Sequence, residues 1–88
     1  MADKPAAFHT FEAPEGRVYA FRKPTTAQID VLVAKTRKSA IQATTNFTLA
    51  IVEPSQRAEW EALLVEKPGY ASDVTESVME KLGFPIRG

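Results

Sequence analysis

The chain has no cysteine, a single histidine, only four glycines and no net charge in its 88 residues. Without cysteine there is neither a disulfide framework nor a thiolate metal site, and one histidine is too few for most histidine-built centres. Zero net charge, from 11 basic and 11 acidic side chains, argues against a protein that binds nucleic acid by neutralising phosphates. The glycines do not form a phosphate-binding loop, because they lie at predicted turns or at the terminus.

Long hydrophobic runs are also missing. The longest stretch without a charged residue, 39–52, is too short and too polar to span a bilayer. The N-terminal segment carries Asp3 and Pro5 where a signal peptide would have its apolar region. We therefore expect a cytoplasmic protein with no membrane partner. We also expect a single domain over residues 1–88, with an ordered core from about 8 to 84 and frayed ends.

The first element that the sequence does contain is a β-hairpin. Two runs rich in aromatic and β-favouring side chains, 8–13 and 17–23, flank a Pro-Glu-Gly triplet that suits a three-residue loop with a glycine bulge. That loop places four rings on one face of the ribbon, in the opposed pairs His9–Phe21 and Phe11–Tyr19. An isolated hairpin is marginal in water, so helices or another subunit must cover this aromatic face.

A long helix is predicted after the hairpin. Thr25 and Gln28 form a capping box, and small or apolar residues then recur at spacings of four and three, which is typical of a packed helix seam. The seam consists of Ile29, Val33, Thr36, Ala40, Ala43, Phe47 and Ala50. Neither proline nor glycine interrupts it before Pro54, so we predict one helix over 26–52, with a break near Ser39 as the main alternative.

Two shorter helices complete the predicted fold, which makes its class α+β: an N-terminal β-hairpin followed by a long helix and two shorter helices. The first runs over about 55–67 with Ser55 as its N-cap, and a Pro-Gly pair ends it. The second runs over about 72–82 and stops at Gly83, a residue type that readily takes the left-handed conformation. Phe84 can then fold back onto the last turn.

A catalytic or metal-binding constellation cannot be assembled from these elements. His9 lies among aromatic residues on a strand, a setting more typical of packing than of a general base. The acidic residues of the last helix, Asp73, Glu76 and Glu80, form a row at spacings of three and four that is typical of a solvated face. We therefore predict a protein that is not an enzyme and that binds no cofactor and no metal ion.

Charge is divided along the chain. Residues 1–52 carry seven basic and four acidic side chains, whereas residues 53–82 carry three basic and seven acidic ones. Solvated helix faces account for this division; a dipolar molecule that meets a basic partner or another copy is the alternative. The basic residues of the first half cluster over 22–38, and a small nucleic-acid-binding regulator that uses them is our second functional hypothesis. They are Arg22, Lys23, Lys35, Arg37 and Lys38.

Protein–protein interaction is the first hypothesis, because the chain has more large apolar side chains than a small core needs. We expect Phe11, Tyr19 and Phe21 to surround a protein-binding patch on the hairpin, with burial of the same rings in the core as the alternative. The helix seam is a second candidate surface. Its small residues also suit packing against a second copy, so the oligomeric state stays open.

Four short motifs mark the order of the elements. Together they carry a resemblance to a known protein family that covers about Phe8 to Phe84. They are VYAFRKPT at 18–25, IVEPS at 51–55, KPG at 67–69 and EKLGF at 80–84. In this order the chain resembles the small tail assembly chaperones of long-tailed bacteriophages and prophages. The resemblance implies a non-enzymatic protein of the bacterial host cytoplasm that coats the tape-measure protein, keeps its apolar helices soluble and recruits tail-tube subunits. Such a chaperone needs an apolar groove with a polar rim.

Overall fold

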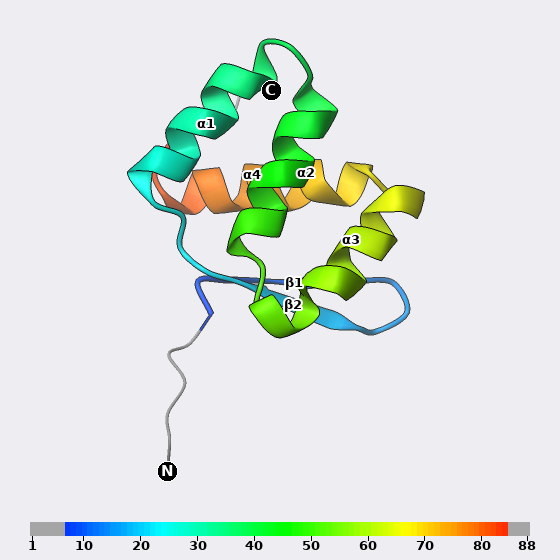
Figure 1. The fold of residues 1–88 in the computed structure, drawn as a ribbon. Coiled ribbons are helices and arrows are strands. Elements are labelled where there is room, and N and C mark those ends of the chain that lie inside the picture. The colour runs from blue at the N-terminus through cyan, green and yellow to red at the C-terminus, as the bar shows by residue number, and fades with distance from the viewer. Residues whose placement is uncertain (1–6, 85–88) are drawn as a thin grey trace.

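The computed structural model describes residues 7–84, which form a hairpin followed by helices (Figure 1). The two strands are β1 (His9–Glu12) and β2 (Val18–Phe21), which pair antiparallel. Four helices follow: α1 (Thr26–Thr36), α2 (Ala40–Ile51), α3 (Arg57–Glu66) and α4 (Gly69–Lys81). The predicted α+β class is confirmed, with four helices in place of three. The predicted frayed ends, Ala7 apart, lie outside the described residues.

The hairpin has the predicted register. Its aromatic side chains are opposed as His9–Phe21 and Phe11–Tyr19. In the loop, the Ala13 N–H donates to the Arg17 carbonyl at 2.9 Å and the Gly16 N–H donates to the Ala13 carbonyl at 2.8 Å. Gly16 has a φ of +98°, which is open to glycine because it lacks a Cβ. The loop chemistry therefore turns the four rings to one face.

The prediction of one long helix over 26–52 is wrong, and the alternative of a break near Ser39 is correct. Ser39 has an extended backbone, with φ −157° and ψ 107°, and its hydroxyl accepts a 3.2 Å hydrogen bond from the Gln42 N–H. This N-cap starts α2, which folds back beside α1 (Figure 1). In this arrangement Leu32 of α1 is buried.

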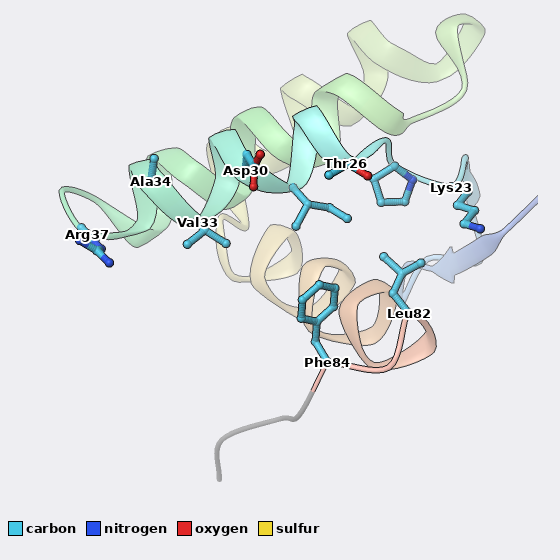
Figure 2. A pocket seen from close by; sticks show the side chains of 10 residues that line it. Lys23, Thr26, Asp30, Val33, Ala34, Arg37, Leu82 and Phe84 are labelled. Carbon is cyan, nitrogen blue, oxygen red and sulfur yellow. The ribbon is translucent and has the colours of Figure 1, made fainter.

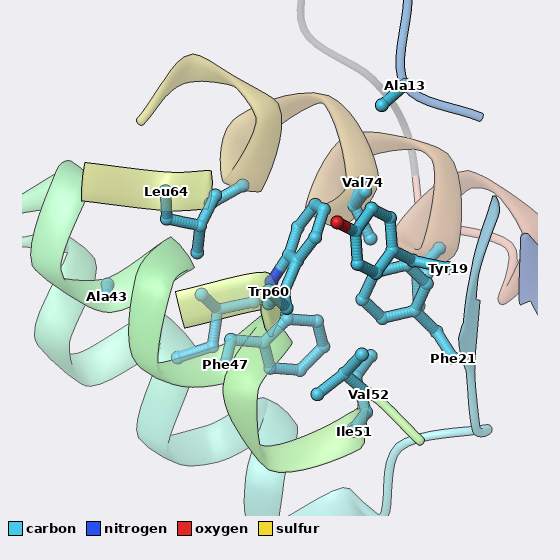
Figure 3. Close-up of a cluster of buried hydrophobic side chains, with 13 residues drawn as sticks. Ala13, Tyr19, Phe21, Ala43, Phe47, Ile51, Val52, Trp60, Leu64 and Val74 are labelled. Atoms are coloured by element: carbon cyan, nitrogen blue, oxygen red, sulfur yellow. The ribbon is translucent and has the colours of Figure 1, made fainter. Parts of the chain in front are cut away.

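The core is organised around Trp60, whose side chain is fully buried (Figure 3). Between ring centroids, the indole lies 5.0 Å from Tyr19, 5.1 Å from Phe21 and 5.7 Å from Phe11. Its N–H donates a 3.0 Å hydrogen bond to the hydroxyl of Thr48 on α2. The aromatic face of the hairpin is therefore covered by α3, through Trp60, and by α4, whose Tyr70 ring lies 5.1 Å from that of Phe11, as the marginal stability of a lone hairpin requires.

The edge of β2 that faces away from β1 is covered by the end of α2 and the segment that follows it. Two backbone hydrogen bonds join them, from Arg22 N–H to the Ile51 carbonyl at 2.7 Å and from Glu53 N–H to the Ala20 carbonyl at 2.8 Å. The side-chain amide of Gln56 continues this pairing. It accepts from the Ala20 N–H at 2.9 Å and donates to the Val18 carbonyl at 2.8 Å. The edge thus has its backbone groups paired and is protected from other strands.

The helix α3 does not begin as predicted. Ser55 lies inside a 3-10 turn, Pro54–Gln56, and α3 starts only at Arg57. Its N-cap residue is Gln56, whose side chain makes no capping bond because it is engaged with β2. The prediction of Ser55 as N-cap is therefore wrong.

The helix α4 begins at Gly69, about one turn before its predicted start, but ends as predicted. Gly83 has a φ of +93°. The Phe84 N–H donates to the Met79 carbonyl at 3.1 Å, a bond that spans the last turn in the way typical of a left-handed helix stop. This stop turns the chain at Phe84 back toward α1.

Candidate functional site

A surface groove runs between α1 and the C-terminal half of α4 (Figure 2). One part has a volume of about 770 Å³, and a second part of about 630 Å³ continues toward α2. Val33, Arg37 and Phe84 line both parts, so the two form one continuous feature, named here the α1–α4 groove. Its large apolar lining residues are Ile29, Leu32, Val33, Met79, Leu82 and Phe84.

The groove exists because α1 and α4 both pack on α2 and hardly touch one another. The side of α1 that faces α4 is therefore left open. Val33 is 50% exposed and Phe84 is 43% exposed. Figure 2 shows Val33 on the side of α1 that faces Phe84 and Leu82, with Asp30 and Ala34 on the outer side of the helix. Apolar surface is thus gathered at this place rather than scattered singly.

The rim of the α1–α4 groove is charged and balanced. Lys23 lies before the start of α1, Asp30 and Arg37 lie along it, and Glu76 comes from α4. None of these four forms an ion pair within residues 7–84, where the observed ion pair joins Arg17 and Glu59. Their charged groups are therefore open to a partner.

The three residues predicted to bind a protein do not form a surface patch. Tyr19 is 2% exposed and Phe21 is fully buried, so the core alternative applies to these two rings. Phe11 is half-buried between Trp60 and Tyr70, with its ring centroid 5.1 Å from that of Tyr70. The aromatic face of the hairpin packs against the core, so the candidate protein-binding surface must lie elsewhere on the molecule.

The helix seam, the second predicted surface, is divided by the break. Ala43 and Phe47 of its second half are buried between α2 and its neighbours. Ile29 and Val33 of its first half line the α1–α4 groove. Part of the predicted seam is thus exposed at a groove, as a binding surface requires.

Leu82 and Phe84, the opposite wall of this groove, were not predicted to be near the seam. Nothing in their sequence position indicates that they meet α1, because the fold-back of α2 places them there. The sequence does contain a signal for the break between α1 and α2. Ser39 is followed three residues later by Gln42, which is the sequence pattern of a helix N-terminus.

A polar cluster joins the hairpin to α3. The Arg17 guanidinium donates two hydrogen bonds of 2.7 Å to the Glu59 carboxylate, and the Tyr19 hydroxyl donates a third at 3.1 Å. The hydrogen bond from Arg17 lowers the pKa of Glu59, while burial raises the pKa of Tyr19. The Glu59 carboxylate is held ionised and the Tyr19 phenol neutral. Near neutral pH the cluster therefore serves to attach the hairpin to α3 rather than to transfer a proton.

His9 packs its ring 6.2 Å from that of Phe21. Burial, and then the charge of Lys81, lower the pKa of His9, and its Nδ1 is buried without a hydrogen-bond partner. Within residues 7–84, no three His, Asp or Glu side chains converge as metal ligands do. Over the same residues, no helix is long and apolar enough to cross a membrane.

The basic residues of 22–38 divide into two groups. Arg22 and Lys23 follow β2, whereas Lys35, Arg37 and Lys38 lie at the other end of α1. The 11 residues of α1 separate them by about 16 Å. Two small basic spots result in place of one patch.

Comparison with known proteins gives a family and a shared fold. A sequence profile of the family described as "Domain of unknown function (DUF6848)" matches residues 10–86. No curated protein matches the chain. An uncharacterised protein from Bacillus stearothermophilus has a similar solved structure, with a TM-score of 0.77 and 20% sequence identity over 92% of this chain and 88% of that one. At this identity the likeness shows the fold alone.

Proposed function

The chain belongs to the DUF6848 family, and we propose that it is a non-enzymatic binding protein that holds an apolar helix of a partner protein in the α1–α4 groove. The observation that carries the proposal is the pair of half-exposed side chains, Val33 and Phe84, that face one another across the groove. A partner helix that lays its apolar face between them removes both from water. Recognition of this kind uses anchors spaced by three, four and seven residues on the partner.

The resemblance to tail assembly chaperones supplies the partner. We propose that the chain binds helical segments of a tape-measure protein in the bacterial cytoplasm and brings tail-tube subunits to them. A groove that is open along its length and lined by a few apolar side chains suits this task. It covers a short helical segment without enclosing it, and the small contact area permits release when the tail assembles.

Affinity purification from the native cells tests this function, with the bound material identified by mass spectrometry. The informative variant is Val33→Asp, which puts a charge on the wall of the groove. Its matched control is Val65→Asp, because Val65 is an exposed valine on α3, 80% exposed and outside the groove lining.

We expect the wild-type chain and Val65→Asp to retain a long, helix-rich tail protein, and Val33→Asp to lose it. Retention of nucleic acid or of a transcription complex would reject the proposal and favour a regulator that uses residues 22–38. Equal retention by Val33→Asp and the wild-type chain would also reject it, because the groove would then have no part in binding.

A further inference from the structure

We propose that two copies of this chain associate through the outer edges of their β1 strands, which pair antiparallel across a two-fold axis at Phe11. The pairing joins two two-stranded hairpins into one sheet of four strands. It is separate from the proposed function, because no residue of β1 lines the α1–α4 groove.

The backbone of β1 has unpaired groups on the side that faces away from β2. The Ala13 N–H bonds to the Arg17 carbonyl, and alternate residues of a strand face the same side, so Phe11 also directs its backbone groups to β2. Thr10 and Glu12 therefore direct theirs outward. Both residues are exposed, and within residues 7–84 these outward N–H and C=O groups have no hydrogen-bond partner.

Other residues limit this open edge at both ends. Toward the start of β1, the Lys81 ammonium donates a 3.0 Å hydrogen bond to the Phe8 carbonyl, which is the next outward group along the strand. Beyond Glu12 the chain enters the hairpin loop, where Pro14 has no N–H to donate. The open edge thus consists of the N–H and C=O groups of Thr10 and Glu12. The outer edge of β2, in contrast, is paired along its length.

The open edge selects one of the two-fold registers that can be centred on it. Centred on Phe11, the pairing places Thr10 opposite Glu12 of the second copy, and every outward N–H of both copies meets an outward C=O. Centred on Thr10, the pairing places Glu12 opposite Phe8, whose carbonyl is already held by Lys81. Centred on Glu12, it sets two carboxylates directly opposite each other, which destabilises a strand pair. The register centred on Phe11 is therefore favoured.

A second copy fits this edge better than a flexible peptide does. So few hydrogen bonds hold a strand only if little backbone freedom is lost on binding, and the β1 strand of another copy is already extended. The Phe11 ring is half-buried beside Tyr70, and the register brings Phe11 opposite Phe11 of the second copy. Such a pair lies between the hydrogen-bonded pairs, where side chains are closest, and aromatic pairs stabilise a sheet there.

Sedimentation equilibrium of the full chain tests the proposal over protein concentrations from about 10 μM to 1 mM. Because the contact is small, we expect a reversible dimer with a Kd of about 10–100 μM. Thr10→Pro removes an outward N–H without removing a bond to β2. It should therefore leave the secondary structure intact, as measured by circular dichroism, and make the chain monomeric over the whole concentration range.

A change of charge at Thr10 tests the register itself. Thr10→Lys places an ammonium opposite Glu12 of the second copy on both sides of the axis, and we expect it to tighten the dimer about fivefold at low salt. Thr10→Glu places two carboxylates opposite each other there and should weaken the dimer by about the same factor. The matched controls, Ala62→Lys and Ala62→Glu, change the charge of an exposed residue on α3 and should alter the Kd by less than about twofold.

The other outcomes of these measurements also have a defined meaning. A chain that stays monomeric at about 1 mM overturns the proposal. So does a dimer that a folded Thr10→Pro variant leaves unchanged, because that dimer uses another surface. If Thr10→Pro disturbs the fold, the two charge variants decide. Changes of the Kd in opposite directions support the pairing, whereas changes in the same direction, or no change, overturn it.

Discussion

The indole N–H of Trp60 donates a 3.0 Å hydrogen bond to the hydroxyl of Thr48, and both side chains are fully buried. The Thr48 hydroxyl in turn donates to the Thr44 carbonyl at 3.0 Å, one turn earlier in α2. Thr44 belongs to the lining of the α1–α4 groove. A single polar pair therefore fixes α3 to the helix on which both walls of the groove are packed.

The first prediction concerns this pair. Thr48→Val keeps the volume of the side chain but removes the acceptor, which leaves the buried indole N–H without a partner. We expect a loss of about 1–3 kcal/mol in the free energy of unfolding, measured by urea denaturation. In the double variant with Trp60→Phe, the added cost of Thr48→Val should be smaller, because the orphaned donor is absent. An unchanged denaturation midpoint for Thr48→Val alone would contradict the role of the bond.

The second prediction concerns the break between α1 and α2. Ser39→Ala removes the hydroxyl that accepts from the Gln42 N–H. We expect it to lower the free energy of unfolding by about 1 kcal/mol, whereas Ser39→Asp, which can also cap, should cost much less. If alanine and aspartate have the same effect, the cap does not stabilise the break.

The third prediction separates a core ring from a groove ring. Phe21→Ala should cost about 3–5 kcal/mol and unfold the domain, because its ring is fully buried against Trp60. Phe84→Ala should leave the chain folded, since its ring is 43% exposed, and should weaken binding of an amphipathic peptide at least about tenfold. Circular dichroism and anisotropy measure the two effects. Unfolding by Phe84→Ala would place Phe84 in a structural role, and unchanged binding by a folded variant would show that its ring does not contact the peptide.

The fourth prediction is a pH dependence. Folding lowers the pKa of His9 from its ordinary value of 6.5, through burial first and then through the charge of Lys81. The unfolded chain therefore binds the proton more readily than the folded one. The resulting stability is present above pH 6.5 and is lost as the pH falls below it, toward the lower pKa of the folded state.

Urea denaturation of the wild-type chain and of His9→Gln between about pH 7.5 and 5 checks this. The wild-type chain should lose more stability than the variant over that interval. Parallel curves for the two proteins would show that His9 has the same pKa in the folded and unfolded states.

The hairpin could be predicted because its determinants are local. The Pro-Glu-Gly loop selects a turn with Gly16 in the left-handed region, and that turn alone fixes which residues oppose each other. The helix stop at Gly83 was predictable for the same reason. In both places a single glycine with a positive φ decides the path of the chain.

The prediction of one long helix was wrong because its residue pattern is compatible with two structures. A seam of small and apolar residues is satisfied by one straight helix against a neighbour, and equally by two helices that fold back. Tertiary packing selects the second, in which Leu32 of α1 is buried. The α1–α4 groove depends on that choice. The Ser39–Gln42 pattern marks the start of α2, but no local pattern encodes the packing of α1 and α4 on α2 that brings Val33 and Phe84 together.

The most direct test of the central claim is to map where an amphipathic helix binds. An amphipathic helical peptide with a leucine stripe is added to isotope-labelled protein, and the amide chemical shifts of the full chain are followed by NMR. We expect shifts confined to the α1–α4 groove, with the largest at Val33, Leu82 and Phe84, and none at Val65 on α3. Shifts confined to the hairpin or to α3 would contradict this expectation.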